Sequence, residues 1–314
     1  MLRMMSYNVR YFGHRHPIRG AGSTRLGLRS VASAIAALAE LPHVVGLQEV
    51  EARSFRSKGS LTPGDREETQ LAAFLRELHE TLVAQQREAR YTALYFPAHA
   101  YRVGALSVYT TGLALMIRDD VAFEADGIHR DVTHRRDHPL AARFKQSRVC
   151  AHVRIHASDG AAVDVFNTHL SLPQFFSPGM LNHKGRMGWG RNQIAEAEAL
   201  ASFVEERRSS DRFVILGDFN AQPGSPAYHR LLERLDARDA LSRWTGHGPE
   251  RLRLDWPSAG FFHLRMRLDH LFLGPGLTAR DFDDTQPFGA PGPFDGLSDH
   301  VPQISRIVPA SSWG

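Results

Sequence analysis

Two polar side chains with the chemistry of a functional site follow an apolar run in the second half of the sequence. Asp218 and Asn220 come after residues 213–216, which are all apolar, and Gly217. Such a run is typical of a strand buried on both faces, and alternate residues of an extended chain share one face. A carboxylate and a carboxamide at such a strand end suit a functional site better than a core. A simple turn is the alternative, because Gly, Asp and Asn are common turn residues.

Polar side chains of the same kind recur at the ends of the other predicted strands. They are Asn8, Glu49, Asn167 with His169, Asp269, and Asp299 with His300. Any one of them can be explained as a turn, but turns do not explain a repetition after nearly every buried strand. Functional sites in layered α/β folds collect at strand ends. The pattern therefore predicts one site built by many strands.

The N-terminal part has the pattern of a strand, a helix and a second strand. Residues 2–7 and 44–47 are strand-like, and apolar residues recur at helical spacing over residues 28–40. In a unit of this kind the two parallel strands end at the same edge of the sheet. We therefore expect Asn8 and Glu49 to lie close together.

Helical and strand patterns continue to alternate along the rest of the chain. We expect helices over residues 67–87, 193–207 and 225–235, and strands over residues 91–96, 113–117, 121–123, 147–155, 163–166, 267–273 and 301–307. Residues 240–260 show no clear periodicity. Since no repeat, low-complexity tract or linker interrupts the chain, we expect one domain over residues 1–314.

Composition narrows the class of protein. The 314 residues include one cysteine, Cys150, which excludes an intrachain disulfide and a cysteine-rich metal site. The sequence shows neither a signal peptide nor an apolar run of about 18 residues, the length of a membrane span. We therefore expect a cytoplasmic protein without membrane insertion. The formal net charge of +4 and the pI near 9.4 are modest indications of an anionic partner.

Three histidines stand close together in the central region. His129, His134 and His138 match no zinc-binding pattern in their spacing. We expect a solvated loop over residues 129–138 rather than a metal site.

Two stretches carry basic residues and no acidic ones. Residues 10–29 hold five arginines, and residues 171–192 combine Lys184, Arg186 and Arg191 with aromatic side chains. Both follow predicted strands that carry site residues, so we expect them at the rim of the site. A basic and aromatic rim suits stacking on bases along a phosphate backbone. The alternatives are a solvated loop for either stretch and contact with a lipid surface for the second.

Six short segments resemble the endonuclease/exonuclease/phosphatase superfamily of divalent-metal phosphoesterases, which includes pancreatic-type deoxyribonuclease, apurinic-site endonucleases and neutral sphingomyelinases. The segments are Ser6-Tyr7-Asn8, Leu47-Gln48-Glu49-Val50, Asn167-Thr168-His169-Leu170, Gly217-Asp218-Phe219-Asn220, Leu268-Asp269-His270 and Ser298-Asp299-His300. They occur in the family's order and span residues 6–300. The resemblance implies an α/β fold, a four-layer α/β/β/α sandwich of two mixed sheets with outer helices.

The same resemblance implies a metal cofactor. Asn8 and Glu49 would hold a Mg²⁺ or Mn²⁺ ion, with Asp299 nearby as a further metal-site residue. Oxygen ligands in small number suit Mg²⁺, which keeps several waters and binds partly through substrate phosphate.

The resemblance also implies a role for each catalytic residue. Asp218 would orient or deprotonate the attacking water, with Asn220 beside it. His169 and His300 would contact the phosphoryl oxygens, and Asp269 would pair with His300 to fix its tautomer and favour its charged form. This set meets the needs of in-line attack on a phosphoester, which are a positioned water and neutralisation of the oxygens.

Other positions depart from the family pattern or extend it. His43 stands where the family often has aspartate, which affects no proposed ligand. His270 is expected to be a satisfied core or surface residue rather than a site residue. The candidates for substrate binding are Asn167, Tyr109, Arg186, Arg191 and Trp189.

The predicted reaction is hydrolysis of a phosphodiester bond by an activated water. We favour a nuclease or nucleotide phosphodiesterase that acts as a monomer without a protein partner. A phosphatase or an enzyme of sphingomyelin or phosphoinositides is the alternative, because the superfamily cleaves all these esters with one core. A catalytically inactive binding module on the same fold is disfavoured, because every metal-binding and water-activating residue is present.

Overall fold

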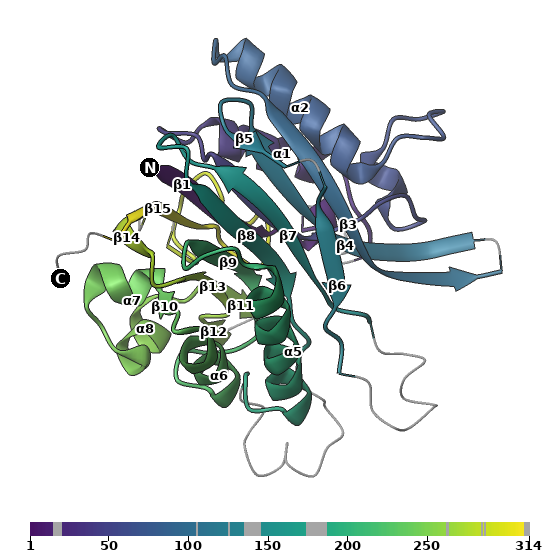
Figure 1. The fold of residues 1–314 in the computed structure, drawn as a ribbon. Helices are drawn as coiled ribbons and strands as arrows, with labels where there is room; N and C mark the ends of the chain where they lie inside the picture. Colours follow the sequence, from purple (N-terminus) through teal and green to yellow (C-terminus); the bar gives the residue numbers. More distant parts are fainter. Residues whose placement is uncertain are drawn as a thin grey trace.

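Two large mixed β-sheets pack face to face, and helices cover their outer faces (Figure 1). The computed structural model describes residues 1–14, 21–104, 106–124, 126–134, 146–173, 187–261, 264–283, 285 and 287–310. The arrangement is the four-layer α/β sandwich that the resemblance implied, so the predicted fold is confirmed.

The first sheet has six strands in the order β14-β15-β1-β2-β4-β3. They are β1 (Leu2–Asn8), β2 (Val44–Val50), β3 (Tyr91–Val103), β4 (Leu106–Arg118), β14 (Leu277–Phe282) and β15 (Gln303–Pro309). β1 and β2 are parallel, with Asn8 opposite Gln48, and the other neighbours are antiparallel. The parallel pair brings Asn8 and Glu49 to the same edge, as predicted.

The second sheet has seven strands, with β10-β13-β9-β8-β7-β5 as its main path and β6 paired to β7. They are β5 (Ala122–Phe123), β6 (Ile128–Asp131), β7 (Val149–His156), β8 (Ala162–His169), β9 (Phe213–Asp218), β10 (Arg238–Asp239) and β13 (Asp269–Leu273). β8 and β9 are parallel, and Asp218 of β9 lies between His169 of β8 and Asp269 of β13. Three predicted site residues thus stand in one row across the sheet.

Helices close the two outer faces of the sandwich. The helices are α1 (Arg25–Ala36), α2 (Gln70–Ala84), α5 (Arg191–Arg207), α6 (Pro226–Leu235), α7 (Ala240–Thr245) and α8 (Pro249–Asp255), with short 3₁₀ turns η1 (Arg10–Phe12) and η2 (Ser57–Ser60). Buried side chains of α1 and α2 pack on the first sheet, and those of α5 and α6 pack on the second. A small hairpin of β11 (Ala259–Phe261) and β12 (Leu264–Met266) stands apart from both sheets.

The strands alternate between two packing layers. On β1, Met4 faces the core between the sheets, whereas Met5 packs under α1 and α2. On β9, Val214 and Ile215 divide in the same way between the central core and the layer under α5 and α6. Because both faces are buried, such strands read as continuous apolar runs. Exposed polar side chains then gather at the strand ends, while buried polar residues within a strand, such as Asn167 and Asp164 of β8, need hydrogen-bond partners.

A polar link crosses between the two sheets near the site edge. Asn167 of β8 is fully buried, and its Nδ2 donates to two backbone carbonyls of the first sheet at 3.1 and 3.0 Å. Its Oδ1 accepts from Nε2 of Gln48 at 2.8 Å. Gly46 allows the sheets to approach closely beside this link, because a Cβ there would lie 1.9 Å from Cδ1 of Leu216 and 3.2 Å from Cγ of Asn167. Hydrogen bonds as well as apolar packing therefore hold the sheets together.

Some elements differ from those predicted. Residues 240–260 contain α7, α8 and β11, which are too short to show a periodicity. β14 was not predicted either, since its sequence mixes polar and apolar residues. β3 and β4 extend beyond the predicted strands into a long hairpin that projects from the sheet (Figure 1).

Part of the predicted histidine loop is wrong. Residues 128–131 form β6, an exposed strand paired with β7, and His129 therefore lies in a sheet. A strand with little burial has no apolar run by which it could be predicted. His138 lies outside the described residues.

The two basic stretches are described only in part. Residues 15–20 and 174–186 lie outside the described residues. Arg25 and Arg29 belong to α1, which begins where Thr24 accepts a hydrogen bond from the Gly27 amide at 2.9 Å. The predicted loop therefore ends before residue 25 rather than at residue 29.

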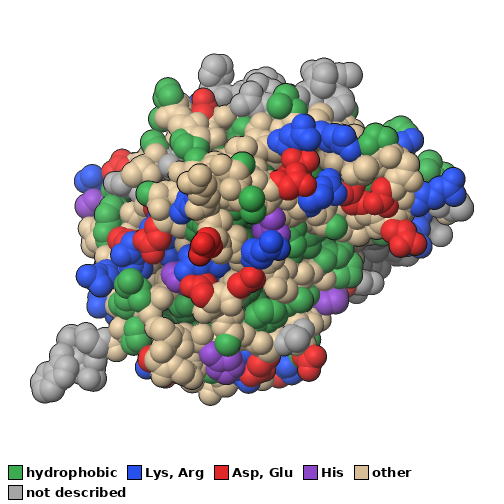
Figure 2. Space-filling model, turned by 90° about the horizontal axis from the view of Figure 1, so that it is seen from above, with side chains coloured by type: hydrophobic (Ala, Val, Ile, Leu, Met, Phe, Trp, Pro, Cys, Tyr) green, Lys and Arg blue, Asp and Glu red, His purple; other side chains and the backbone are tan. Residues whose placement is uncertain are grey.

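The surface carries both signs of charge. On the face that Figure 2 presents, Lys and Arg side chains are interspersed with Asp and Glu, and apolar side chains lie between them. This face shows no extended basic patch. Among the described residues, no helix is both long and apolar enough to span a membrane.

Asp164 provides a test of the packing between β7, β8 and the turn before β9. Its carboxylate accepts from Nε2 of His152 at 2.8 Å, from Nε of Arg154 at 3.0 Å, and from the amide and hydroxyl of Ser209 at 2.7 and 2.8 Å. Burial alone would raise the pKa of Asp164, but hydrogen bonds from His152 and Ser209 lower it to about 2. Its stabilising contribution is therefore present above the unfolded-state pKa of about 3.9 and is lost as pH falls towards 2.

We expect Asp164→Asn to lower the free energy of unfolding by about 2–4 kcal/mol at pH 7, because charge-assisted hydrogen bonds are lost. The difference from the natural protein should shrink below about pH 4. Urea denaturation at pH 7 and pH 3.5 measures both values, and Asp211→Asn at an exposed position is the control. A difference of equal size at both pH values would contradict the assignment.

Candidate active site

The predicted site residues converge where strands of both sheets end. β1 supplies Asn8, β2 Glu49, β8 His169, β9 Asp218 and β13 Asp269, and Asp299 with His300 precede β15. Strand alternation explains most of this convergence. Asp218 lies on the same face of β9 as Leu216, which belongs to the core between the sheets. Where that apolar core stops, the same faces carry polar groups.

Glu49 reaches the site through an irregularity in β2. Regular alternation would place it on the helix side of the sheet with Val45. The pairing with β4 shifts register between Gln48 and Val50, and Glu49 has a φ of 58°. A bulge of this kind re-aims a side chain. Oε1 of Glu49 accepts from Nδ2 of Asn8 at 3.3 Å.

Asp218 is the buried centre of the site. Its Oδ2 accepts from Nδ2 of Asn8 at 2.9 Å, and its Oδ1 accepts from the Asn220 amide at 3.0 Å. Nε2 of His169 and Nε2 of His300 lie 3.5 and 3.7 Å from Oδ2. Burial raises the pKa of Asp218 to about 7, although the charge of His300 acts in the opposite direction. A carboxyl group that titrates near neutral pH suits proton transfer from water.

The turn after β9 fixes the orientation of Asp218. Asn220 has a φ of 47°, and its Nδ2 donates to the Leu170 carbonyl at 2.9 Å. Gln193 at the start of α5 donates to the Asn220 carbonyl at 2.6 Å. Gly217 is required here, because a Cβ would lie 2.1 Å from the carbonyl oxygen of Thr168. Asn220 therefore holds the turn that presents Asp218.

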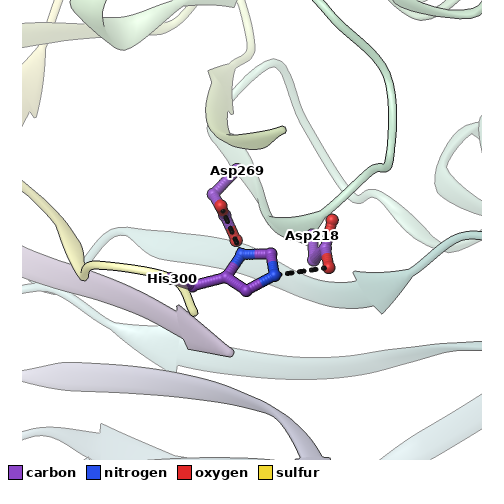
Figure 3. Close-up of side chains that lie close together, drawn as sticks. All are labelled: Asp218, Asp269 and His300. Atoms are coloured by element: carbon purple, nitrogen blue, oxygen red, sulfur yellow. Dashed lines mark hydrogen bonds and ion pairs between the residues drawn. The ribbon is translucent and has the colours of Figure 1, made fainter. Parts of the chain in front are cut away.

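His300 lies between two carboxylates (Figure 3). Its Nδ1 donates to Oδ2 of Asp269 at 2.8 Å, and that oxygen also accepts from the hydroxyl of Ser258 at 2.7 Å. Burial alone would lower the pKa of His300, but Asp269 and Asp218 raise it well above its usual value. His300 is therefore a buried cation at neutral pH.

His169 has the opposite electrostatic character. Its Nδ1 lies 3.0 Å from Nη1 of Arg148. Since a guanidinium can only donate, Nδ1 accepts and the proton of the neutral ring is on Nε2. Burial, Arg148 and His300 together lower the pKa of His169 well below its usual value. Nε2–H points towards Asp218 at 3.5 Å and Glu49 at 4.0 Å.

The donor set at Glu49 and Asp299 fits a hard divalent cation. The two side chains are 26% and 24% exposed, so their oxygens reach the surface of the site. Oδ2 of Asp299 forms an ion pair with Nη1 of Arg10 at 2.8 Å, so the Asp299 carboxylate faces a positive charge. Oδ1 of Asn8 accepts from the Arg10 amide at 3.0 Å, while its Nδ2 faces Glu49. Carboxylate and amide oxygens are the ligands that Mg²⁺ prefers.

A second group of potential ligands lies deeper. Within the part of the chain that the structure describes, ligand atoms of Asp218, Asp269 and His300 lie within 4.8 Å of one another. These residues could hold a metal ion, but Nδ1 of His300 is committed to Asp269. Oδ1 of Asp269 is buried without a hydrogen-bond partner. The more exposed carboxylates are the better place for an ion that also contacts substrate.

Backbone strain is concentrated at this edge. Of the seven non-glycine residues with positive φ among those described, five belong to or closely follow strands that carry site residues. They are Arg10, Tyr11 and Phe12 in the turn after β1, Glu49 and Asn220. Such conformations cost about 1–3 kcal/mol each and persist where the surroundings impose them, often at functional sites.

The predicted substrate-binding residues lie in different environments. The prediction that Asn167 binds substrate is wrong, because its side chain is fully buried. Both Oδ1 and Nδ2 of its carboxamide form hydrogen bonds within the protein. Tyr109 is half-buried on β4, with the Arg56 guanidinium 4.9 Å from its ring centroid. Arg191 is exposed at the start of α5, and Trp189 is half-buried just before it. Arg186 lies outside the described residues.

His270 is a core residue, as expected. It is fully buried, with Nδ1 2.9 Å from Asp239 and Nε2 2.9 Å from the Ala221 carbonyl.

Two contributors were not predicted from the sequence. Arg148 contacts His169, and Ser258 contacts Asp269, from positions 21 and 11 residues away along the chain. Ser258 lies in the segment without periodicity, and nothing in the local sequence distinguishes Arg148 from other arginines. Arg10 belonged to a predicted basic rim, but its pairing with Asp299 had no sequence signal.

A family model agrees with the convergence of these residues. The model of the endonuclease/exonuclease/phosphatase family matches residues 5–300. No curated protein sequence matches the chain.

Solved structures agree with the fold. An endonuclease/exonuclease/phosphatase from Beutenbergia cavernae DSM 12333 is 18% identical with a TM-score of 0.62, and the match covers 98% of this chain and 71% of that one. A mannosyl-6-phosphatase from Bacteroides thetaiotaomicron is 16% identical with a TM-score of 0.60, covering 98% and 100%. ANGEL2, a 2′,3′-cyclic phosphatase in complex with adenosine-2′,3′-vanadate, is 15% identical with a TM-score of 0.62, covering 98% and 95%.

The charge of His300 gives a direct test of the site's electrostatics. We expect Asp269→Asn to lower the pKa of the His300 ring, because the variant keeps a hydrogen-bond acceptor but removes the negative charge. NMR titration of the histidine ring signals in EDTA measures this pKa, and Asp211→Asn is the matched control. An unchanged His300 titration in Asp269→Asn would rule out Asp269 as the source of the charge.

Proposed function

Because the chain belongs to the endonuclease/exonuclease/phosphatase family and is a phosphoesterase of that family, we propose that it hydrolyses phosphodiester bonds as a nuclease or nucleotide phosphodiesterase. The observation that carries this proposal is the pair of histidines around Asp218. One is a buried cation and the other a neutral donor, and both direct Nε2 towards the same carboxylate. This arrangement suits attack of water on a phosphoester, with donors placed where charge develops on the phosphoryl oxygens.

The chain's own side chains can provide each function that an in-line hydrolysis needs. Asp218 accepts a proton from the attacking water, since its carboxyl group titrates near neutral pH. Nε2–H of His169 and Nε2–H of His300 donate to the phosphoryl oxygens, where negative charge develops. Asn8 keeps Asp218 in place through the hydrogen bond from its Nδ2.

We further propose Mg²⁺ or Mn²⁺ as cofactor, held by Asn8, Glu49 and Asp299. The family generally depends on a divalent metal, and the partly exposed carboxylates suit an ion that also binds substrate. When bound, the ion supplies neutralisation of charge on the phosphoryl and leaving oxygens. Arg10, which pairs with Asp299, would bind and orient the substrate beside it.

Nucleotide or nucleic-acid esters are the substrates we favour. Arginines line the site at Arg10 and Arg148, and a similar structure, ANGEL2, was solved with adenosine-2′,3′-vanadate. A phosphatase is the second candidate, because another similar structure is a mannosyl-6-phosphatase. A lipid phosphoesterase and an inactive binding module remain alternatives that the experiments below distinguish. We also propose that residues 1–314 act as one domain and as a monomer, since both sheets complete one site.

Loss of the central side chains should abolish hydrolysis. We expect Asp218→Asn, Glu49→Gln and His300→Ala each to lower kcat/KM for bis-p-nitrophenyl phosphate by about 10²–10⁴-fold, because each removes proton transfer or charge stabilisation. The matched controls are the exposed Asp211→Asn, Glu233→Gln and His229→Ala, which should retain activity. Near-full activity in all three site variants would sink the assignment.

Metal removal and a substrate panel test cofactor and substrate together. EDTA should abolish hydrolysis, and Mg²⁺ or Mn²⁺ should restore it, because the site carboxylates need a cation to bind phosphate. Among plasmid DNA, RNA, a nucleotide diester, a sugar phosphate, inositol phosphates and sphingomyelin, we expect a nucleotide-containing ester to be cleaved fastest. A chelator-resistant enzyme would contradict the metal assignment, and a faster sugar phosphate or lipid would replace the proposed substrate class.

A further inference from the structure

A pocket of about 480 Å³ adjoins the catalytic site. Arg10 and Asp299 line it and also belong to the site edge, so the two spaces are continuous at these residues. Arg265, Phe288, Phe294 and Asp295 form the more distant walls. The volume is within the range of about 300–1,000 Å³ that is usual for small-ligand pockets. None of the distant residues has a role in the proposed chemistry.

The hairpin of β11 and β12 that forms one wall is fixed to the catalytic segment. The Gly260 amide donates to the Asp299 carbonyl at 2.9 Å, and the Val301 amide donates to the Ser258 carbonyl at 2.8 Å. Ala259 pairs with His300 in an isolated bridge. A ligand in the pocket is therefore held at a fixed position relative to His300.

The wall on the hairpin side is aromatic and closely packed. Phe288 lies against Gly260, where a Cβ would be 2.5 Å from its ring. The Arg265 guanidinium lies 4.8 Å from the centroid of the Phe288 ring, which gives a planar surface. Phe294 is buried and packs edge-on against Tyr7 with centroids 5.5 Å apart. Planar surfaces of this kind suit a flat aromatic ligand.

The polar groups of the pocket favour a base over a second phosphate. Away from the proposed metal ligands, Arg265 is a donor and Asp295 is a carboxylate that repels a dianion, and His14 also lines the pocket. Donors, acceptors and aromatic surface together match the edge and faces of a heterocyclic ring.

We propose that this pocket binds the nucleobase of a nucleotide ester whose phosphate lies at Asp218 and His300. The inference rests on the proposed function and specifies it. The hairpin and the segment that contains Phe288, Phe294 and Asp295 would select nucleoside esters. Arg265, which lies over the Phe288 ring, stacks with the base, and Asp295 accepts from its ring or amino N–H groups.

Two esters with the same leaving group test the pocket. Thymidine 5′-(p-nitrophenyl phosphate) carries a base, and methyl p-nitrophenyl phosphate does not. We expect the natural enzyme to prefer the thymidine ester, and Arg265→Ala and Phe288→Ala each to lower that preference in kcat/KM about tenfold, through KM. Arg280→Ala, an exposed arginine on β14, is the control and should leave the preference unchanged. An unaltered preference in both pocket variants would overturn the proposal.

A binding measurement separates failure of the pocket from failure of the proposed function. Calorimetry with AMP and ribose 5-phosphate requires no hydrolysis. Arg265→Ala should weaken AMP binding about tenfold and leave ribose 5-phosphate unaffected. Equal weakening of both would identify an anion site and overturn the base assignment. Hydrolysis of neither ester by the natural enzyme would refute the proposed function, while the AMP result would still decide the pocket.

Discussion

The site depends on the interactions that stabilise the buried carboxylate of Asp218. A buried charge is costly unless hydrogen-bond donors and opposite charges surround it. Asn8 of the first sheet and His169 of the second supply such groups, and His300 supplies a cation from the segment before β15. The carboxylate is thus satisfied only when both sheets are packed together. Formation of the sandwich and formation of the site are therefore one event.

The two histidines differ because their outer neighbours differ. Asp269 lies behind His300, and Arg148 lies behind His169. A carboxylate favours the imidazolium form, and a guanidinium disfavours it. Two rings that face the same carboxylate thus hold different charges at one pH. Both still present an N–H group, so the site can donate two hydrogen bonds without placing two adjacent cations in a buried space.

The strand ends could be predicted from the sequence because polar residues interrupt long apolar runs. The resemblance added the four-layer fold and the roles. The prediction that Asn167 binds substrate was wrong. Asn167 shares a face of β8 with His169 but lies two residues further into the sheet, where its amide contacts backbone carbonyls of the facing sheet. The contacts of Arg148 and Ser258 join different elements of the fold, which no local pattern reveals. The bulge that turns Glu49 inward depends on pairing with β4.

In the proposed function, reaction and selectivity belong to different parts of the fold. The residues around Asp218 stand on strands whose faces are fixed by the core, so their positions can change little without loss of packing. The β11–β12 hairpin lies outside both sheets and joins the catalytic segment through a few backbone hydrogen bonds. Its exposed residues and the half-buried Phe288 can vary with little effect on the core, whereas Phe294 belongs to the core under α1 and α2. One catalytic set can therefore serve many phosphoesters, with the choice among them made by the parts that the sheets do not constrain.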